Sequence, residues 1–239
     1  MTSPGAITIP LFTDAHDGVV HAFGTKAGGV ASPVHKTATQ FQVVSVNQVH
    51  GIDVLILAGP MTDSEVREAA SARNFDAIIT DRPRTWLTVR TADCVPVLFL
   101  GPDRGVIAAA HAGWRGTVAG ITAKIVQLMQ GVFDCKRESI QVAIGPAIGR
   151  CCYEVDEPVL EPLKRAFPFW LKAVSDAGGG RGHLDLGRLN RLALEATGVD
   201  PSRIFGVNLC TACHPELFHS YRRDGKGTRH MISGIARVQ

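Results

Sequence analysis

Two apolar runs that lie close together in the sequence constrain the fold most strongly. Val95–Leu100 and Val106–Ala110 contain only apolar residues, and a Gly-Pro-Asp turn lies between them. Short apolar runs bounded by turn residues predict strands buried on both faces. Asp93 and Cys94 precede the first run and His111 follows the second. We therefore expect an acid, a thiol and an imidazole at one end of a buried strand pair.

The rest of the chain predicts a mixed α/β (α+β) fold. Ser175–His183, rich in glycine, is expected to be a mobile loop but is too short for a domain linker. We therefore expect residues 1–239 to form a single domain, with a mixed β-sheet core flanked by helices. Further strands are predicted at Val19–Phe23, Phe41–Val46, Asp53–Leu57, Ala77–Thr80, Trp86–Val89, Ile140–Ile144 and Ile204–Val207, and helices at about Glu65–Ala72, Thr117–Gln130, Asp156–Phe167 and Leu186–Thr197.

The composition points away from nucleic acids and membranes. Apolar residues make up 45% of the 239 residues, which is enough for a sizeable core. The formal net charge is only +3 and no run of Lys or Arg occurs, so we expect no nucleic-acid partner. No apolar run of about 18 residues occurs, and the first residues do not resemble a signal peptide. We expect a cytoplasmic protein without a membrane partner, whose six cysteines stay mostly reduced.

Three short polar segments beside apolar runs contain side chains that can bind a metal. They are NQVHGID, TADCVP and HAGWRG, which contain His50, Cys94 and His111. Imidazole and thiolate are ligands that suit Zn²⁺, and three protein ligands with an open fourth position are typical of catalytic zinc. The spacing is not that of a zinc finger, so the fold has to assemble such a site. The alternative is a turn histidine, a small core thiol and a strand-end histidine without a metal.

HAGWRG also has features of an anion site. Its glycines precede a predicted helix, whose first backbone N–H groups attract anions, and Arg115 can add a bidentate phosphate contact. Trp114 offers a flat face on which a base can stack. The alternative is a tight glycine turn with Trp114 in the core.

The C-x-x-C-H pattern at Cys210–His214 has several interpretations. It matches c-type haem attachment, which is disfavoured because that chemistry accompanies export. Cys210, Cys213 and His214 alternatively bind a structural metal with a fourth ligand from elsewhere, or form only a strand end and a loop. The vicinal Cys151 and Cys152 are poor candidates for a disulfide, because adjacent residues strain the bridge. The basic segment Phe218–His230 is either a solvated loop or an arm that contacts anions.

Several motifs occur in an order that resembles one protein family. They are NQVHG, DAIITD, TADCVPVLF, HAGWRGTVAGI, IGPAIGRCCYEV, HLDL, CT and SYRRDG. Together they resemble the bacterial YfiH group of polyphenol oxidase or laccase-domain proteins, whose members are also described as purine nucleoside phosphorylases. The resemblance extends from about His21 to Ile235, and TADC with HAGWRG at this separation is its most specific part.

The resemblance implies a single α/β domain similar to cysteine-hydrolase-like folds and a zinc pocket of two histidines and one cysteine. Carried over by motif, the ligands are His50, Cys94 and His111, the three residues that ligand chemistry also favours. Adenosine, inosine and guanosine phosphorolysis is implied, with methylthioadenosine phosphorolysis and adenosine deamination as further activities. The expected partners are purine nucleosides and phosphate, and the expected state is a monomer. Copper, implied by the older family name, is disfavoured because the nine histidines form no His-x-His pairs.

Roles follow for particular residues of this pocket. Besides the three ligands, Asp93 is an expected catalytic residue that moves protons. The expected contacts to substrate or phosphate come from Lys26, Gln48, Trp114 and Arg115. The chain departs from the family around Lys26, where the family usually has Arg, and in the following stretch PVHKTATQFQVVSV, which is short and lacks the family's Asn and GD…NR signatures.

Two alternatives to the phosphorylase stay open at this point. Cys94 as a thiolate nucleophile, with His50 or His111 as base, predicts hydrolysis of an amide or ester, a role related to editing of cell-wall precursors. A metal- or nucleoside-binding module that has lost its activity is the second alternative. Oxidation of polyphenols by copper is the least favoured activity.

Overall fold

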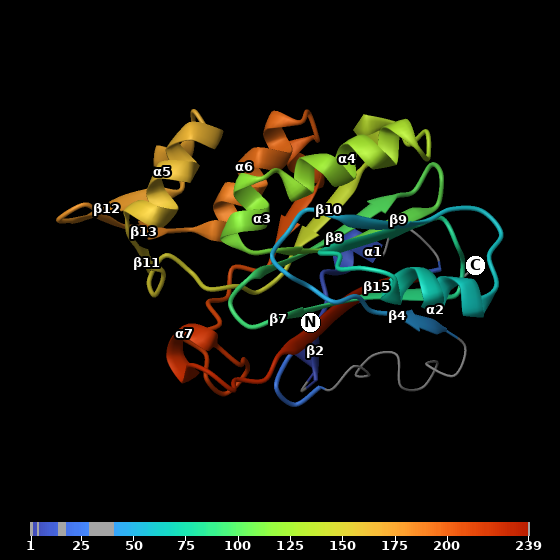
Figure 1. The fold of residues 1–239 in the computed structure, drawn as a ribbon, viewed down its shortest axis with the longest axis horizontal. Coiled ribbons are helices and arrows are strands. Elements are labelled where there is room, and N and C mark those ends of the chain that lie inside the picture. Colours follow the sequence, from blue (N-terminus) through green and yellow to red (C-terminus); the bar gives the residue numbers. More distant parts are fainter. Residues whose placement is uncertain (1, 4, 14–17, 29–40, 239) are drawn as a thin grey trace.

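Two six-stranded sheets pack face to face at the centre of the part of the chain that the structure describes (Figure 1). This computed structural model describes residues 2–3, 5–13, 18–28 and 41–238. The first sheet has the order β1 (Thr2–Ser3), β2 (Ala6–Ile7), β3 (Val19–Gly24), β15 (Met231–Arg237), β7 (Thr85–Thr91) and β4 (Gln42–Val44). The second has the order β14 (Ile204–Gly206), β10 (Gln141–Ile144), β8 (Val95–Gly101), β9 (Val106–Ala112), β6 (Ala77–Thr80) and β5 (Val54–Leu57).

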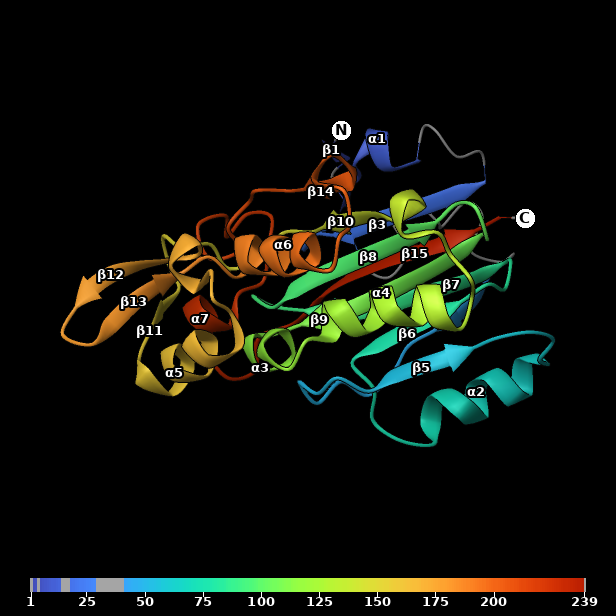
Figure 2. The same cartoon turned by 90° about the horizontal axis from the view of Figure 1, so that it is seen from above.

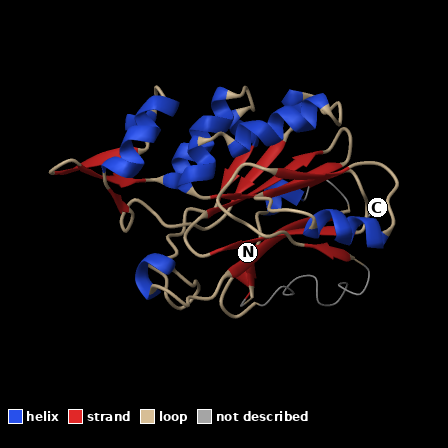
Figure 3. Cartoon of the chain, in the orientation of Figure 1, coloured by secondary structure: helices blue, strands red, loops and turns tan. Residues whose placement is uncertain are grey.

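Helices form a third layer on the outer face of the second sheet, as Figures 2 and 3 show. They are α3 (Trp114–Val118), α4 (Ile121–Gly131), α5 (Glu157–Ala166) and α6 (Leu186–Ala196). A small sheet of β11 (Glu154–Val155), β13 (Arg181–Leu184) and β12 (Val174–Gly178) projects at one end. The other helical segments are α1 (Pro10–Thr13), α2 (Asp63–Ser71), α7 (Tyr221–Asp224) and short 3₁₀ turns at Arg137–Ser139, Trp170–Lys172 and Pro201–Arg203.

The two apolar runs of the sequence are β8 and β9, and both of their faces are buried. Alternate side chains point to opposite faces of a strand. In β8, Val97 and Phe99 pack with the helices, whereas Leu98 and Leu100 pack between the two sheets. A strand that contributes to two cores on its two faces needs apolar residues at every position. This accounts for the unbroken runs.

The mixed α/β fold predicted from the sequence is confirmed. Each predicted strand is present, with ends that differ by a few residues. The predicted helices near residues 65, 156 and 186 are α2, α5 and α6. Thr62 begins α2 with a capping box to Glu65, and the Asp185 side chain caps α6 by accepting the N–H of Arg188.

The predicted helix Thr117–Gln130 is two helices instead of one. Gly120 has φ +85° and separates α3 from α4. That left-handed backbone is easy for glycine and interrupts a helix. The first helix begins at Trp114, three residues before the predicted start, and the second ends at Gly131, one residue after the predicted end.

Two expectations about loops and strands were wrong. The segment Ser175–His183, expected to be a loop, lies in the β12–β13 hairpin, which turns at the three positive-φ glycines Gly178, Gly179 and Gly180. The strand β15 was missed, although it lies between β3 and β7. Its Gly234 weakens the strand pattern, yet a Cβ there would lie 2.5 Å from the Leu87 carbonyl oxygen, so the close strand pairing requires glycine.

Among the described residues, no helix is long and apolar enough to cross a membrane. The stretch that follows Lys26 and departs from the family pattern lies partly outside the described residues, at positions 33–40. The cytoplasmic location expected from the sequence stays a prediction.

Candidate active site

The register of β8 and β9 brings Cys94 next to His111. Pro96 pairs with His111, and Cys94 lies just before the paired segment on the same face of the sheet. His50 arrives from the loop before β5, and its ring lies 4.8 Å from the His111 ring, centroid to centroid. One ligand atom from each of the three side chains lies within 4.8 Å of the other two. The structure therefore assembles the three residues that the sequence predicts as metal ligands.

Asp76 organises this cluster, and sequence reasoning missed it. It lies directly before β6, is fully buried, and its Oδ1 is 2.8 Å from Nδ1 of His111. Its two oxygens also accept the backbone N–H groups of Val49, His50 and Gly51 at 3.2, 2.9 and 2.6 Å. One carboxylate thus orients one imidazole and holds the loop that carries the other. The only signal in the sequence was the DAIITD motif, which contains Asp76.

Electrostatics within the cluster favour ionised partners. Burial alone would raise the pKa of Asp76, but hydrogen bonds from His111 and the backbone N–H groups of Gly51 and Val49 lower it overall. Burial would lower the pKa of His111, but contacts with Asp76 and Cys94 raise it to about 9. Burial would raise the pKa of Cys94, yet His111 and His50 lower it to about 7. The site is therefore built to hold a thiolate between two imidazoles.

Two residues of the site have left-handed backbone conformations. His50 has φ 64° and Asp93 has φ 92°. Such conformations cost roughly 1–3 kcal/mol each in non-glycine residues and cluster at functional sites. The surrounding hydrogen bonds, from Asp76 to the His50 loop and from Thr211 and Arg222 to Asp93, hold both conformations in place.

Because Gly113 has no side chain, α3 can begin in contact with the cluster of His50, Cys94 and His111. A Cβ on Gly113 would lie 3.0 Å from both Sγ of Cys94 and Cδ2 of His50. The helix start expected near Thr117 lies instead at Trp114, and the anion contact expected at the helix start stays a prediction. Thr117 is buried inside α3, and its Oγ1 is hydrogen-bonded to the side chain of Asn190 at 3.0 Å. The helix begins at the three-residue cluster.

A cavity of about 720 Å³ opens in front of the cluster. That volume lies in the range of small-molecule sites, roughly 300–1,000 Å³. Cations and aromatic rings line it together with the three predicted ligands, and several of these residues were not predicted from the sequence. The lining comprises Gln48, His50, Arg90, Ala92, Asp93, Cys94, His111, Trp114, Ile148, Tyr153, Leu186, Tyr221, Arg222, Thr228 and His230.

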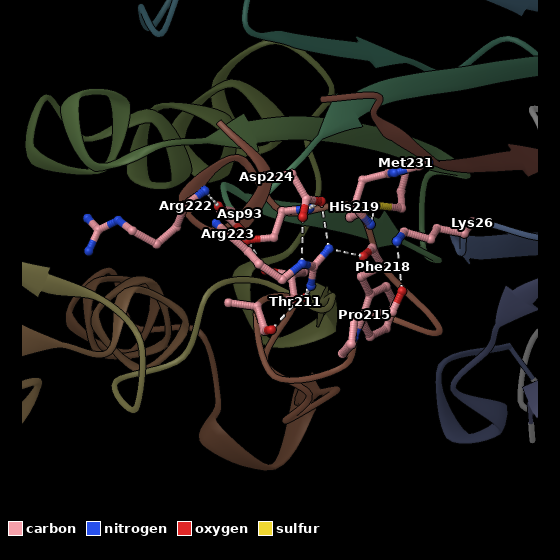
Figure 4. A network of polar contacts seen from close by, with 12 residues as sticks. Lys26, Asp93, Thr211, Pro215, Phe218, His219, Arg222, Arg223, Asp224 and Met231 are labelled. Atoms are coloured by element: carbon pink, nitrogen blue, oxygen red, sulfur yellow. Dashed lines mark hydrogen bonds and ion pairs between the residues drawn. The ribbon is translucent and has the colours of Figure 1, made fainter. Parts of the chain in front are cut away.

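Two of the expected phosphate contacts do not line the cavity. The Lys26 ammonium donates to the Pro215 carbonyl at 2.7 Å, as Figure 4 shows. Arg115 is exposed, and its guanidinium lies over the Trp114 ring at 4.4 Å from the centroid. Arg222, from the basic segment Phe218–His230, does line the cavity.

Gln48 and Asp93 lie at the cavity with their polar atoms already engaged. The Gln48 amide donates to the Arg90 carbonyl and accepts the Arg90 N–H, both at 2.8 Å. Asp93 accepts the Thr211 hydroxyl at 2.6 Å and the Arg222 backbone N–H at 2.7 Å, one on each oxygen (Figure 4). Each of these side chains therefore ties the cavity wall to another segment of the chain.

The donor set fits a transition metal. Two imidazoles and a thiol converge, and the Asp76 contact to Nδ1 of His111 leaves Nε2 of that ring for an ion. A carboxylate behind a ligating histidine is the usual arrangement around bound zinc. Three ligands at the edge of a cavity leave a further position for a substrate or water.

Comparison with known proteins identifies the family of this chain. The sequence model of the family described as "Multi-copper polyphenol oxidoreductase laccase" matches residues 21–238. The chain belongs to this laccase-like YfiH family. The solved structure of a hypothetical protein YfiH from Bacillus licheniformis superposes with a TM-score of 0.85 at 31% identity, covering 98% of this chain and 97% of that one.

Named relatives within the laccase-like YfiH family are enzymes of nucleoside metabolism. "Purine nucleoside phosphorylase YlmD" from Geobacillus stearothermophilus is 38% identical over 200 residues, which cover 81% of this chain and 72% of that protein. "Adenosine deaminase RL5", from an unknown prokaryotic organism, is 33% identical over 201 residues, 82% of this chain and 75% of that protein. The family therefore supports an enzyme, and two activities are attached to its members.

Proposed function

We propose that this chain is a metal-dependent purine nucleoside phosphorylase that acts on adenosine, inosine and guanosine. Methylthioadenosine phosphorolysis and adenosine deamination are proposed as further activities of the same cavity. The observation that carries the proposal is the cavity itself. It combines the His50–Cys94–His111 cluster with aromatic and cationic side chains in a volume suited to a nucleoside and phosphate. The names of relatives support the same reactions.

The aromatic side chains of the cavity suit a purine. Trp114 and Tyr153 line it together with the apolar Ile148 and Leu186. Burial raises the pKa of the Tyr153 hydroxyl to about 12, so Tyr153 stays neutral and can donate a hydrogen bond to a ring nitrogen. Flat apolar walls with a few polar groups bind and orient a base.

The cations of the cavity suit phosphate. Phosphorolysis joins a phosphate oxygen to C1′ of the ribose and breaks the C1′–N9 bond, and the purine leaves with a proton. Arg90 and Arg222 line the cavity, and Arg222 also lies over the Tyr153 ring at 5.1 Å. His230 lines it too, but burial and the charges of Arg90 and His111 lower its pKa, so it contributes a neutral imidazole. Guanidinium groups hold phosphate through paired hydrogen bonds. We propose these two arginines for phosphate in place of Lys26 and Arg115, which the structure directs elsewhere.

His50, Cys94 and His111 would hold the metal, with Asp76 orienting His111. Zn²⁺ suits two imidazoles and a thiolate, and when bound it supplies Lewis acidity that stabilises negative charge. Copper is the metal of the family name, but oxidation of phenols needs several coppers and more histidine ligands than this cavity offers among the described residues.

Asp93 and Gln48 act as positioning residues in this proposal. Both Asp93 oxygens already accept hydrogen bonds, so moving a proton would first require breaking one. Asp93 instead fixes the backbone that presents Cys94 and holds α7, which carries Arg222. Gln48 likewise joins the His50 loop to β7 at Arg90.

One observation keeps the cysteine nucleophile as a second candidate. Asp76, His111 and Cys94 form a chain of contacts in which the carboxylate orients the imidazole beside the thiol. This is the arrangement of an activated nucleophile in amide or ester hydrolysis. About one metal ion bound through Cys94 contradicts that function, because a metal-bound thiolate is a poor nucleophile.

A nucleoside panel tests the proposal. Adenosine, inosine, guanosine and methylthioadenosine are incubated with and without phosphate, and the products are identified. Wild-type protein should release free base and ribose 1-phosphate only with phosphate, and should form inosine from adenosine without it. Cys94→Ala should lower both rates by about 100-fold or more. The control is Cys135→Ala, a buried cysteine outside the cavity.

Three results would contradict the proposal. Wild-type rates in Cys94→Ala would remove the metal ligand from the reaction. Nucleoside binding without turnover in the wild-type protein would identify a binding module. Metal-free protein whose Cys94 is readily alkylated, and which hydrolyses amides or esters, would identify the cysteine nucleophile.

A further inference from the structure

Four cysteines far from the catalytic cluster in sequence meet at a second place in the fold. Cys151 and Cys152 lie in the loop after β10, whereas Cys210 and Cys213 lie in the loop after β14. Their four sulfurs lie within 4.8 Å of one another. Sγ of Cys213 is 3.4 Å from both Sγ of Cys151 and Sγ of Cys152. His214, the alternative ligand in the sequence, instead contacts Glu216 at 3.2 Å.

These separations suit one tetrahedral ion. With metal–sulfur bonds of about 2.3 Å, the sulfurs of a tetrahedral four-thiolate site lie about 3.8 Å apart. The separations here, from 3.4 Å to at most 4.8 Å, bracket that value. Four thiolates and no open position are typical of a structural zinc site, and thiolates select zinc over magnesium or calcium.

The backbone of the two loops is arranged around the sulfurs. Ala147 and Cys210 form a parallel β-bridge, and the Thr211 N–H donates to the Ala147 carbonyl at 3.0 Å. The Gly149 N–H donates to Sγ of Cys210 at 3.2 Å. A Cβ on Gly149 would lie 3.3 Å from Sγ of Cys151, so glycine permits the approach of the two loops.

Arginines from α7 hold both loops through their backbone carbonyls. The Arg222 guanidinium donates to the carbonyls of Cys152 and Glu154 at 3.3 and 3.0 Å. The Arg223 guanidinium donates to the carbonyls of Thr211 and Ala212 at 3.0 and 3.2 Å (Figure 4). Arg223 also pairs with Asp224 at 2.7 Å, which holds its guanidinium in place between the loop and α7.

We propose that Cys151, Cys152, Cys210 and Cys213 bind one structural Zn²⁺. The ion would join the loop after β10 to the loop after β14. Both loops border the catalytic cavity. Ile148 and Tyr153 of the first line it, and Thr211 of the second holds Asp93 beside Cys94. The second site would therefore brace the part of the cavity wall that contains Ile148, Tyr153 and Asp93.

Metal content tests the proposal. The chain is purified from cells without added metal, and zinc, iron and copper are measured per chain. Wild-type protein should hold about two equivalents of metal, and Cys213→Ser and Cys94→Ala about one each. The Cys94→Ala variant loses the first metal site but should keep the second ion. The two proposed sites are therefore tested separately. Cys135→Ala, a buried lone cysteine, should keep both.

The absorption spectrum of bound cobalt reports the ligands directly. This measurement does not require the Cys213→Ser variant to fold. Co²⁺ replaces zinc in the Cys94→Ala variant, which lacks the catalytic thiolate. Four thiolates should give an intense sulfur-to-cobalt charge-transfer absorption, which Zn²⁺ then removes. In the wild-type protein, alkylation of the four cysteines should be slow and should speed up about tenfold or more after chelation.

Several outcomes would overturn the proposal. One equivalent of metal in wild-type protein, unchanged in Cys213→Ser, excludes a second site. A protein mass lower by two hydrogens, with a bridge between Cys213 and either Cys151 or Cys152, identifies a disulfide instead. Iron in place of zinc excludes the structural zinc, and fast alkylation of the four thiols before chelation excludes any bound ion.

Discussion

The two ligand clusters of this molecule differ in every feature that decides what a metal does. The His50–Cys94–His111 cluster combines imidazole and thiol, faces a cavity of about 720 Å³ and offers three ligands. The Cys151–Cys152–Cys210–Cys213 cluster contains four thiols and offers a complete tetrahedral set. An incomplete set leaves room for substrate, whereas a complete one only joins the segments that carry it. The comparison therefore favours a chemical role for the first cluster and a bracing role for the second.

The supports of the two clusters differ in the same way. The buried carboxylate of Asp76 orients His111 and holds the His50 loop. Among the described residues, the contacts around the cysteine cluster are the Gly149 N–H, which donates to Cys210, and the guanidinium groups of Arg222 and Arg223, which donate to carbonyls of the two loops. A carboxylate fixes the ring orientation and the tautomer of a histidine ligand. Thiolates need no such orientation, so backbone N–H donors are sufficient for them.

The largest expected effect comes from Asp76→Asn. The amide keeps the size of the side chain but loses the charge that faces His111. We expect metal affinity at the catalytic cluster to fall about 10- to 100-fold, with a parallel loss of phosphorolysis. Metal content after dialysis and the nucleoside assay measure both, and the four cysteines should keep their ion. Asp103→Asn, which changes a carboxylate near the surface, is the control. Unchanged metal affinity would show that Asp76 contributes to packing but does not orient His111 as a metal ligand.

A chelator should remove the metal ions from the two clusters at different rates. The catalytic cluster faces the cavity and has three ligands, so its ion should leave about tenfold faster than the ion held by four thiolates. Activity should disappear with the first equivalent and thermal stability with the second. Time courses of released metal, activity and melting temperature on one sample measure this order. Simultaneous loss of both ions would contradict the division into an open and a closed site.

Thr211→Val tests the link between the two clusters. The hydroxyl of Thr211 donates to Asp93 at 2.6 Å, and both residues are buried. Leaving a buried carboxylate oxygen without its partner costs about 1–3 kcal/mol. We expect a loss of that size in the free energy of unfolding, and a rise in KM larger than the fall in kcat. Denaturant unfolding and steady-state kinetics measure the two effects.

The matched control for this link is Thr122→Val. Thr122 is also buried, but its hydroxyl has no hydrogen-bond partner in the structure. Removing that hydroxyl should leave the free energy of unfolding unchanged or slightly higher. An equal loss of stability in both variants would show that the Thr211–Asp93 contact contributes nothing specific.

The smallest effect is expected from Arg115→Gln. This guanidinium is exposed and lies on Trp114 outside the cavity lining. Exposed charge contacts contribute about 0–1 kcal/mol, so the KM for phosphate should change less than about twofold. Phosphate titration at saturating inosine measures it. A change of tenfold or more would restore Arg115 as the phosphate ligand that the sequence predicted.

Local patterns predicted most strands of the two large sheets, most of the helices and the three residues of the His50–Cys94–His111 cluster. The continuous apolar runs of β8 and β9 and the capping signals of α2 and α6 depend on near neighbours in sequence. Local sequence patterns failed where contacts between distant segments decide the secondary structure. The strand β15 contains Gly234 because Trp86 and Leu87 leave no room for a side chain. The β12–β13 hairpin forms from a glycine-rich segment because β11 pairs with it.

The sequence by itself determined which chemistry was present. It supplied two histidines and a thiol in motifs that end or precede strands, and a C-x-x-C pair and a vicinal pair of cysteines. Only the tertiary structure decided how these groups combine. It placed Asp76 against His111, left Lys26 and Arg115 outside the cavity lining, and joined the two cysteine pairs. The physical reason is range: propensity and periodicity act between neighbours, whereas ligand sets and cavity walls come from contacts between segments far apart in the chain.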